Sequence, residues 1–272
     1  MAKSVFQLFL LLLFLSLSAG ARGQQTLHFI ASIDQVNDDI RQGCAKDYEE
    51  AFALFRAIAQ DAGMRFNHQK LPFDQGSVEG FLINEYSCGS DDVVVFLFSG
   101  HGFRYEDDGE EWPWPYLFYC NRAQSTNTEN CEVDMDWVQA LLMEHNPRLS
   151  IVLGDCCNNV QHNPEANETL NQLGSLAEDV DPNSTGTYAN LDLIRSFRGN
   201  IIASAAKPGQ QAETNDESGS HFFGAFRYHM LNALQSQQPT SWESILGNTR
   251  NMVMQLSNNQ QTPLFCVNGR CY

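Results

Sequence analysis

A histidine and a pair of cysteines occur directly after two short apolar segments, and residues of these types can act together in nucleophilic catalysis. His101 follows residues 93–98, and Cys156 and Cys157 follow residues 149–154. A thiol is mostly protonated at neutral pH, so a thiol nucleophile needs a nearby imidazole to take its proton. The sequence therefore predicts a cysteine–histidine pair if the two segments lie side by side.

Both apolar segments are rich in β-branched residues and are predicted to be buried strands of a mostly parallel sheet. In open α/β sheets, ligands bind in the crevice outside the carboxyl ends of the strands. Further strands are expected at residues 26–32, 64–71, 201–205 and 262–267, and helices at residues 43–62, 77–86, 133–145, 220–234 and 241–256. This alternation predicts an α/β fold, a three-layer sandwich around a mostly parallel sheet of about six strands, in one domain over residues 24–272.

Residues 1–23 have the three parts of a secretory signal peptide. Lys3 precedes an apolar stretch at residues 5–17, and small residues follow it. This stretch is shorter than the roughly 20 residues of a typical membrane span. We expect the segment to be removed and the protein to be exported, to the periplasm or the extracellular space; an uncleaved anchor is the alternative.

The chain is strongly acidic. Its formal net charge is −17, and loss of the leader takes this to −19 because the leader carries two basic residues and no acidic one. Such a charge argues against nucleic acid and anionic membrane surfaces as partners. It is compatible with a polypeptide substrate that carries positive charge, while the oligomeric state stays open.

All eight cysteines lie after the leader, and disulfides are expected in an exported chain. Spacing favours two local bridges, Cys120–Cys131 and Cys266–Cys271, and a longer bridge between Cys44 and Cys88. This assignment leaves Cys156 and Cys157 free. A zinc site is the other interpretation of the cysteines, but the chain has no C-x-x-C pair and no H-E-x-x-H helix, so no metal ligands are assigned.

Five motifs, in this order along nearly the whole chain, resemble those of the caspase-like cysteine peptidases, with the metacaspases as the closest branch. They are Gly43-Cys44-Ala45-Lys46-Asp47, Ser99-Gly100-His101-Gly102, Asp155-Cys156-Cys157, Ile202-Ala203-Ser204-Ala205 with Gly224-Ala225-Phe226, and Gln261-Thr262-Pro263. One departure is that the family usually continues Asp-x-Cys-His-Ser-Gly, whereas this chain continues with Asn158-Asn159-Val160.

The resemblance implies a role for each matching residue. Asp155 stands two positions before the family's nucleophile, which makes Cys157 the nucleophile and Cys156 a small buried residue. His101 would take the thiol proton and return it to the leaving amine. The backbone N–H groups of Gly102 and Cys157 would bind the oxyanion.

The resemblance also implies an acidic pocket for the residue before the scissile bond. Asp47 and Asp155 occupy the matching positions, and a partly buried carboxylate pair would favour Arg or Lys there. Asp155 could instead cap a turn, and Asp47 could be a first-turn helix acid.

No cofactor is required for this chemistry. Many metacaspases use Ca²⁺ as an activator, and the acidic residues from Glu106 to Glu111 could bind it. A solvated loop is the favoured interpretation, because their spacing does not match a known calcium loop.

Three other functions stay open. The altered residues Asn158 and Asn159 would fit a catalytically silent caspase-like binding protein. If Cys156 and Cys157 are merely structural, the chain would fit an interaction protein that is stabilised by disulfides. An endopeptidase specific for Asn could cut itself at the many asparagines of residues 158–190. An enzyme specific for Arg or Lys could not, because residues 158–194 contain neither, and we therefore expect it to work as one uncut chain.

Overall fold

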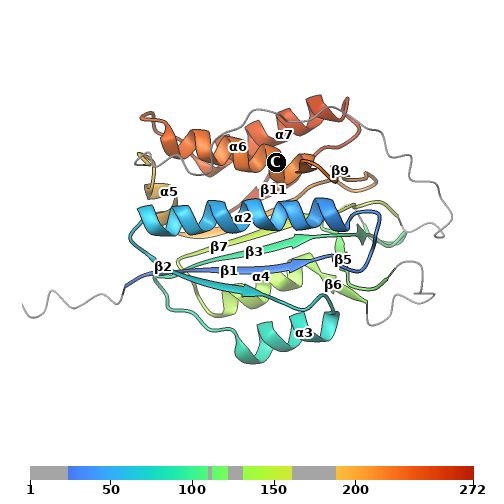
Figure 1. Cartoon of the computed structure of the whole chain (residues 1–272), viewed down its shortest axis with the longest axis horizontal. Coiled ribbons are helices and arrows are strands. Elements are labelled where there is room, and N and C mark those ends of the chain that lie inside the picture. The colour runs from blue at the N-terminus through green and yellow to red at the C-terminus, as the bar shows by residue number, and fades with distance from the viewer. Residues whose placement is uncertain (1–23, 110–111, 122–130, 161–187) are drawn as a thin grey trace, which may run out of the picture.

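A computed structural model describes residues 24–109, 112–121, 131–160 and 188–272 (Figure 1). The predicted signal peptide lies outside these residues, as does most of the asparagine-rich segment. In chain order the elements are β1 (Thr26–Ile33), α2 (Arg41–Asp61), β2 (Arg65–Lys70), α3 (Gln75–Gly80), the π-helix η1 (Phe81–Glu85), β3 (Val93–Ser99), β4 (Gly102–Phe103), β5 (Tyr116–Phe118), β6 (Glu132–Asp134), α4 (Met135–Glu144), β7 (Leu149–Asp155), α5 (Asp192–Arg195), β8 (Gly199–Ser204), β9 (Thr214–Asn215), β10 (Gly219–Ser220), α6 (His221–Gln235), α7 (Trp242–Leu256), β11 (Leu264–Val267) and β12 (Arg270–Cys271).

The centre of the molecule is a seven-stranded sheet with the order β12-β11-β8-β7-β3-β1-β2. The five strands from β8 to β2 run parallel, whereas β11 and β12 are antiparallel to their neighbours. The predicted mostly parallel sheet is therefore confirmed, and β12 is the strand that was not expected. β7 and β3 lie in the middle, and all their residues are buried.

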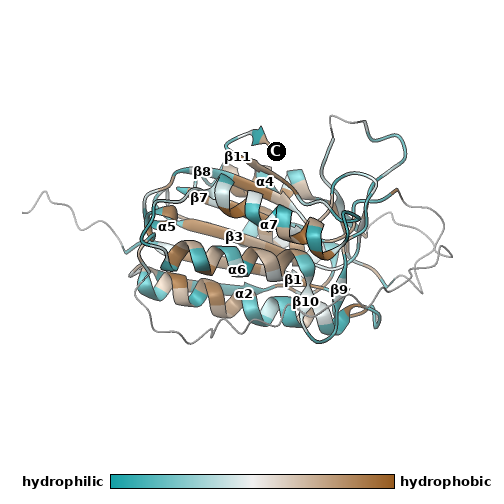
Figure 2. Cartoon of the chain, turned by 90° about the horizontal axis from the view of Figure 1, so that it is seen from above, coloured by the Kyte–Doolittle hydropathy of each residue, from teal (hydrophilic) through white to brown (hydrophobic). Residues whose placement is uncertain are grey.

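Helices cover both faces of the sheet, which confirms the three-layer sandwich. Figure 1 shows α2, α6 and α7 on one face and α3 and α4 on the other. Alternate residues of the inner strands enter one of two cores; in β3, Val95 packs toward α2 and α6, and Phe96 packs toward α4. In Figure 2 the central strand β3 is largely brown, whereas α2, α6 and α7 carry both teal and brown residues.

Polar side chains determine where several helices begin. Asp134 caps α4 by accepting a hydrogen bond from the Asp136 N–H at 2.8 Å, so the helix begins after the residues that form β6. Ser220 caps α6 in the same way, accepting from the Phe223 N–H at 2.9 Å. The expected helix at residues 77–86 is divided into α3 and the π-helix η1.

Two small sheets, which the sequence analysis did not find, lie where the parallel strands end. β4, β5 and β6 form a three-stranded antiparallel sheet, and β9 and β10 form a hairpin. β5, β6 and β9 are labelled at the right of Figure 1, at the end toward which the arrows of β1 and β3 point. These short strands therefore surround the carboxyl edge of the sheet.

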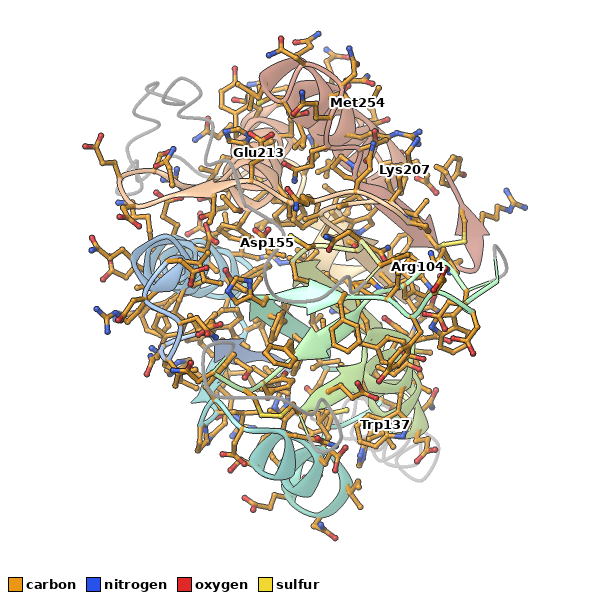
Figure 3. The ribbon with its side chains drawn as sticks, turned by 90° about the vertical axis from the view of Figure 1, so that its right-hand side faces the viewer. Arg104, Trp137, Asp155, Lys207, Glu213 and Met254 are labelled. Atoms are coloured by element: carbon orange, nitrogen blue, oxygen red, sulfur yellow. A yellow bond between two sulfur atoms is a disulfide. The ribbon has the colours of Figure 1, made fainter. Side chains whose placement is uncertain are left out.

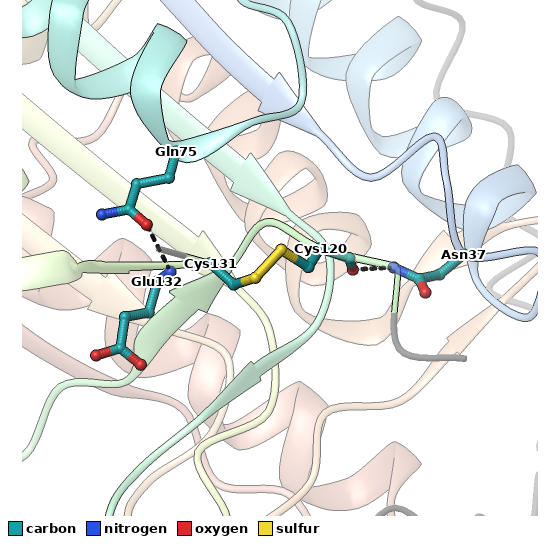
Figure 4. Close-up of a disulfide and its surroundings, with 5 residues drawn as sticks. All are labelled: Asn37, Gln75, Cys120, Cys131 and Glu132. Atoms are coloured by element: carbon teal, nitrogen blue, oxygen red, sulfur yellow. Dashed lines mark hydrogen bonds between the residues drawn. A yellow bond between two sulfur atoms is a disulfide. The ribbon is translucent and has the colours of Figure 1, made fainter. Parts of the chain in front are cut away.

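Two of the three predicted disulfides are present. Cys120 is bonded to Cys131, and Cys266 to Cys271 (Figure 4 shows the first). The predicted bridge between Cys44 and Cys88 is wrong, because both thiols are free. Cys44 lies near the end of β3, whereas Cys88 precedes its start, and a seven-residue strand separates these points by about 20 Å.

Candidate active site

The cysteine and histidine segments meet because β3 and β7 are neighbouring parallel strands. Their register pairs Ser99 with Asp155, so the residues that follow both strands leave the sheet at the same edge. His101 and Cys157 both line one cavity of about 120 Å³ at this edge. Figure 3 looks onto this side of the molecule and has Asp155 near its centre. The structure thus places the thiol and the imidazole along the same cavity.

The two adjacent cysteines have different surroundings. Cys156 is buried in the core that faces α4, and burial raises the pKa of its thiol well above the usual value. Cys157 is partly exposed and contacts the loop after β8: its Sγ accepts from the Ala212 N–H at 3.3 Å and lies 3.8 Å from the Ala212 carbonyl oxygen. Cys157 is therefore the more accessible of the two adjacent thiols.

Gly102 lies against the backbone of the cysteine pair. A Cβ at this position would stand 2.5 Å from the Cys156 Sγ and 2.7 Å from the Cys157 carbonyl oxygen. The preceding residue is fixed as well, because the His101 carbonyl accepts from the Phe118 N–H at 3.0 Å. The close approach of the two loops thus requires glycine here.

We expect Gly102→Ala to lower the free energy of unfolding by about 1–3 kcal/mol, because the new methyl group forces β4 away from Cys157. Peptidase activity should fall with it. Urea denaturation measures the first effect. Gly247→Ala is the control, because nothing lies within 4 Å of its added Cβ in helix α7. Equal stability of Gly102→Ala and wild type would contradict the predicted contact.

The two predicted substrate-binding acids are both buried beside the cavity, but only one of them lines it. Asp155 and the hydroxyl-bearing Ser99 and Ser220 are lining residues. Asp47 lies behind them and is 1% exposed. Its carboxylate accepts from the Ser99 hydroxyl and from the Ser220 N–H, both at 2.8 Å. The Ser220 hydroxyl donates to Asp155, so one serine connects the two acids.

Burial makes this acid pair reluctant to ionise. Burial raises the pKa of Asp155 to about 7. Burial, and then the neighbouring charge of Asp155, raises the pKa of Asp47 well above its usual range. The cost of ionising both acids falls when a cation enters the cavity.

The cavity is small beside the 300–1,000 Å³ or so of a typical ligand pocket, and so it suits a single side chain.

Several residues of this site were not singled out from the sequence. Ser220 was expected only as the start of a helix, and Ser99 was noted only as part of a motif. Gly219 adopts a φ of +75° and passes Asp47 so closely that a Cβ would lie 2.4 Å from its carboxylate oxygen. The roles of Gly219 and Ser220 depend on the β9–β10 hairpin, which has only two residues in each strand and no apolar pattern of its own.

Among the described residues, no three His, Cys, Asp or Glu side chains form a cluster that could hold a metal ion. Glu110 and Glu111, two of the acidic residues considered for Ca²⁺ binding, lie outside the described residues. Within the part of the chain that the structure covers, no helix has both the length and the apolar character needed to cross a membrane.

The comparison with protein families identifies the family of the chain. The caspase domain model matches residues 33–270, which include both strand ends and both acids. The chain belongs to the caspase domain family. Membership makes cysteine peptidase chemistry the expected activity of this caspase domain. A comparison with curated proteins finds no match.

Proposed function

We propose that this caspase domain is a cysteine endopeptidase of the metacaspase type, with Cys157 as nucleophile and His101 as its base. The observation that carries the proposal is that both side chains line one cavity at the carboxyl ends of β3 and β7. Asp155 lines the same cavity. A nucleophile, a base and a recognition group therefore share one site, as peptide hydrolysis requires.

The proposed reaction has two stages. The imidazole takes the proton of the Cys157 thiol, and the thiolate attacks the peptide carbonyl carbon. The backbone N–H groups of Gly102 and Cys157 stabilise the oxyanion, and His101 gives its proton to the leaving amine. A water molecule, deprotonated by the same imidazole, then hydrolyses the thioester and restores the thiol.

Specificity for Arg or Lys before the scissile bond is proposed from the acid pair. A guanidinium or ammonium group in the cavity would be next to Asp155, with Asp47 behind it. The two serine hydrogen bonds hold the carboxylates in place before the substrate arrives, which reduces the entropy lost on binding. An Asn side chain, in contrast, brings no charge to offset the two acids.

The wider setting of the enzyme is also a proposal. Two disulfides are typical of an oxidising compartment, and together with the signal-like residues 1–23 they support export. The partner is a polypeptide substrate, with no role for nucleic acid. The chemistry needs no cofactor, and Ca²⁺ would act only as an activator.

We expect the active enzyme to be one uncut chain that begins near Gln24. The first basic residues after Cys157 are Arg195 and Arg198, and both lie at the amino edge of the sheet, away from the site. The Arg195 side chain donates to the carbonyls of Asp61 and Ala62 at the far end of α2. Intact mass of freshly purified active protein tests this. Two fragments divided within residues 158–190 would contradict it and favour the Asn-specific enzyme.

A catalytically silent binding protein is the second candidate, and the contact of Cys157 with Ala212 favours it. That loop would have to move, or pair with the substrate, before attack could occur. A peptide library that varies the residue before the scissile bond, tested on wild type and Cys157→Ala, decides between the two functions. Cleavage after Arg or Lys by wild type alone supports the peptidase; no cleavage of any peptide supports the binding protein.

A further inference from the structure

Asp39 lies next to the imidazole of His101, in a turn that the sequence analysis treated as a polar loop. Its Oδ2 is 3.3 Å from the His101 Nε2. The histidine side chain is 9% exposed and the aspartate side chain 41%. We propose that Asp39 is a positioning residue that orients His101 and stabilises its protonated form. The inference rests on the proposed function, in which His101 serves Cys157.

The geometry assigns different tasks to the two ring nitrogens. Asp39 faces Nε2 at ion-pair distance and a carboxylate has no hydrogen to donate, so the carboxylate favours the ring form that carries its hydrogen on Nε2. In the neutral ring this leaves Nδ1 with a lone pair, and Nδ1 is then the atom that takes the thiol proton. After that transfer the ring is positively charged, and the Asp39 carboxylate attracts it. The proton passes from Sγ to Nδ1 and later to the leaving amine, and Asp39 stays ionised throughout.

The turn that carries Asp39 is held by buried polar contacts. Asp34, which is fully buried, accepts from the N–H groups of Val36 and Asn37 at 3.0 Å and from the Asn37 side chain at 2.7 Å. The Asn37 carbonyl in turn accepts from the Ile40 and Arg41 N–H groups, where α2 begins. Asp39 therefore stands on a fixed backbone although its side chain is partly exposed.

The same disulfide-bonded segment supports both partners of the pair. The Asn37 side chain donates to the Cys120 carbonyl at 3.0 Å, beside the Cys120–Cys131 bond (Figure 4). Two residues before Cys120, the Phe118 N–H holds the His101 carbonyl. The distance between carboxylate and imidazole is thus set through one short segment. This coupling favours a positioning role over a chance surface contact.

Other titratable groups face the same site and must be considered in any pH measurement. Asp155 and Glu213 are the carboxyl groups that line the cavity, and Cys44, Cys156 and Cys157 are the thiols. Asp34 underlies Gly100, but its carboxylate oxygens are engaged by the turn. A change at Asp39 should therefore be compared with the loss of an equal charge nearby.

The experiment uses Asp39→Asn and Asp39→Ala, with Asp39→Glu as the conservative variant. Asp38→Asn is the matched control: it removes the same charge one residue away, from a side chain that is 86% exposed and pairs with Arg41. We expect kcat to fall about three- to tenfold in Asp39→Asn and Asp39→Ala, with KM unchanged. Asp39→Glu should recover part of the loss, and Asp38→Asn should match wild type.

A second measurement separates orientation from general damage. The rate of Cys157 alkylation by iodoacetamide is followed at pH 6.5 and at pH 9. The charged imidazole helps to form the thiolate at the lower pH but not at the higher one. Asp39→Asn should therefore lower the rate about three- to tenfold at pH 6.5 and leave it unchanged at pH 9.

Two outcomes would overturn the inference. One is that Asp39→Asn behaves like Asp38→Asn in both kcat and alkylation. The other is that KM rises while kcat stays constant, which would make Asp39 a substrate contact. If the wild type cleaves no peptide, the proposed function fails, but the alkylation ratio still tests whether Asp39 acts through His101.

Discussion

Replacing Cys157 or His101 with alanine is expected to lower kcat for peptide hydrolysis by about a thousandfold or more, while the protein stays folded. The first change removes the atom that attacks, and the second removes the group that activates it. Cys157 is only partly buried, and neither side chain belongs to the two main cores, so thermal unfolding should change little. Initial rates on a peptide amide and a melting curve for each variant test this.

Cys156→Ala is the control for this prediction and should keep most of the activity. Cys156 is a buried member of the core that faces α4, and the alanine variant loses one small buried group there. Its cost should appear in the free energy of unfolding instead. An inactive Cys156→Ala beside an active Cys157→Ala would shift the proposed nucleophile by one residue.

The second large effect is expected at Asp155. Asp155→Asn should lower kcat/KM on Arg and Lys substrates about 30-fold or more, because the cation would lose its direct partner. In wild type the same parameter should rise between about pH 6 and pH 8, since the pKa of Asp155 is raised to about 7 and the ionised form binds the cation. Preferred cleavage after Asp or Asn by wild type would disprove this specificity.

The same substitution should stabilise the protein at high pH. Because the pKa of Asp155 is about 7 in the folded state and near 3.8 when unfolded, the folded state holds the proton more tightly. The free energy of unfolding contributed by this group therefore falls as pH rises from about 4 to about 7. An asparagine at position 155 does not titrate, so this fall in the free energy of unfolding is removed, and its side-chain oxygen can still accept from the Ser220 hydroxyl.

Chemical denaturation at pH 5 and pH 8 tests this consequence. Asp155→Asn should exceed wild type in stability at pH 8 and approach it at pH 5. Glu144→Gln is the control, because it removes an acid from the exposed end of α4 and should leave the pH dependence unchanged. A variant that is less stable than wild type at pH 8 would contradict the raised pKa.

Much of the fold could be predicted because its signals are local. The apolar segments that became β3 and β7 are continuous and β-branched, and the edge where they end follows from their parallel direction. Cys120 and Cys131 could be paired because only ten residues separate them. Spacing also favoured a bridge between Cys44 and Cys88, and that prediction failed because the spacing of distant cysteines carries no information on their separation in the fold.

The remaining part of the site depends on contacts between distant segments. Asp39 lies in a polar stretch without periodicity, and its meeting with His101 depends on how the turn after β1 folds against β5. Ser220 is 173 residues from Asp47, to which its N–H donates. Strands of two or three residues, such as β5 and β9, are too short to show an alternating pattern. These features could be found only from the structure.

The burial of Cys44 and Cys156 has a consequence for how a reduced nucleophile survives in a chain that contains two disulfides. Disulfide exchange needs a thiolate as the attacking species. Burial, and then the carboxylate of Asp47, holds the pKa of Cys44 well above its usual value, and burial does the same for Cys156. The two thiols that share the cavity with Cys157 therefore stay protonated and are poor partners for it. The fold keeps three cysteines within one cavity without cross-linking them, and the nucleophile stays available for substrate.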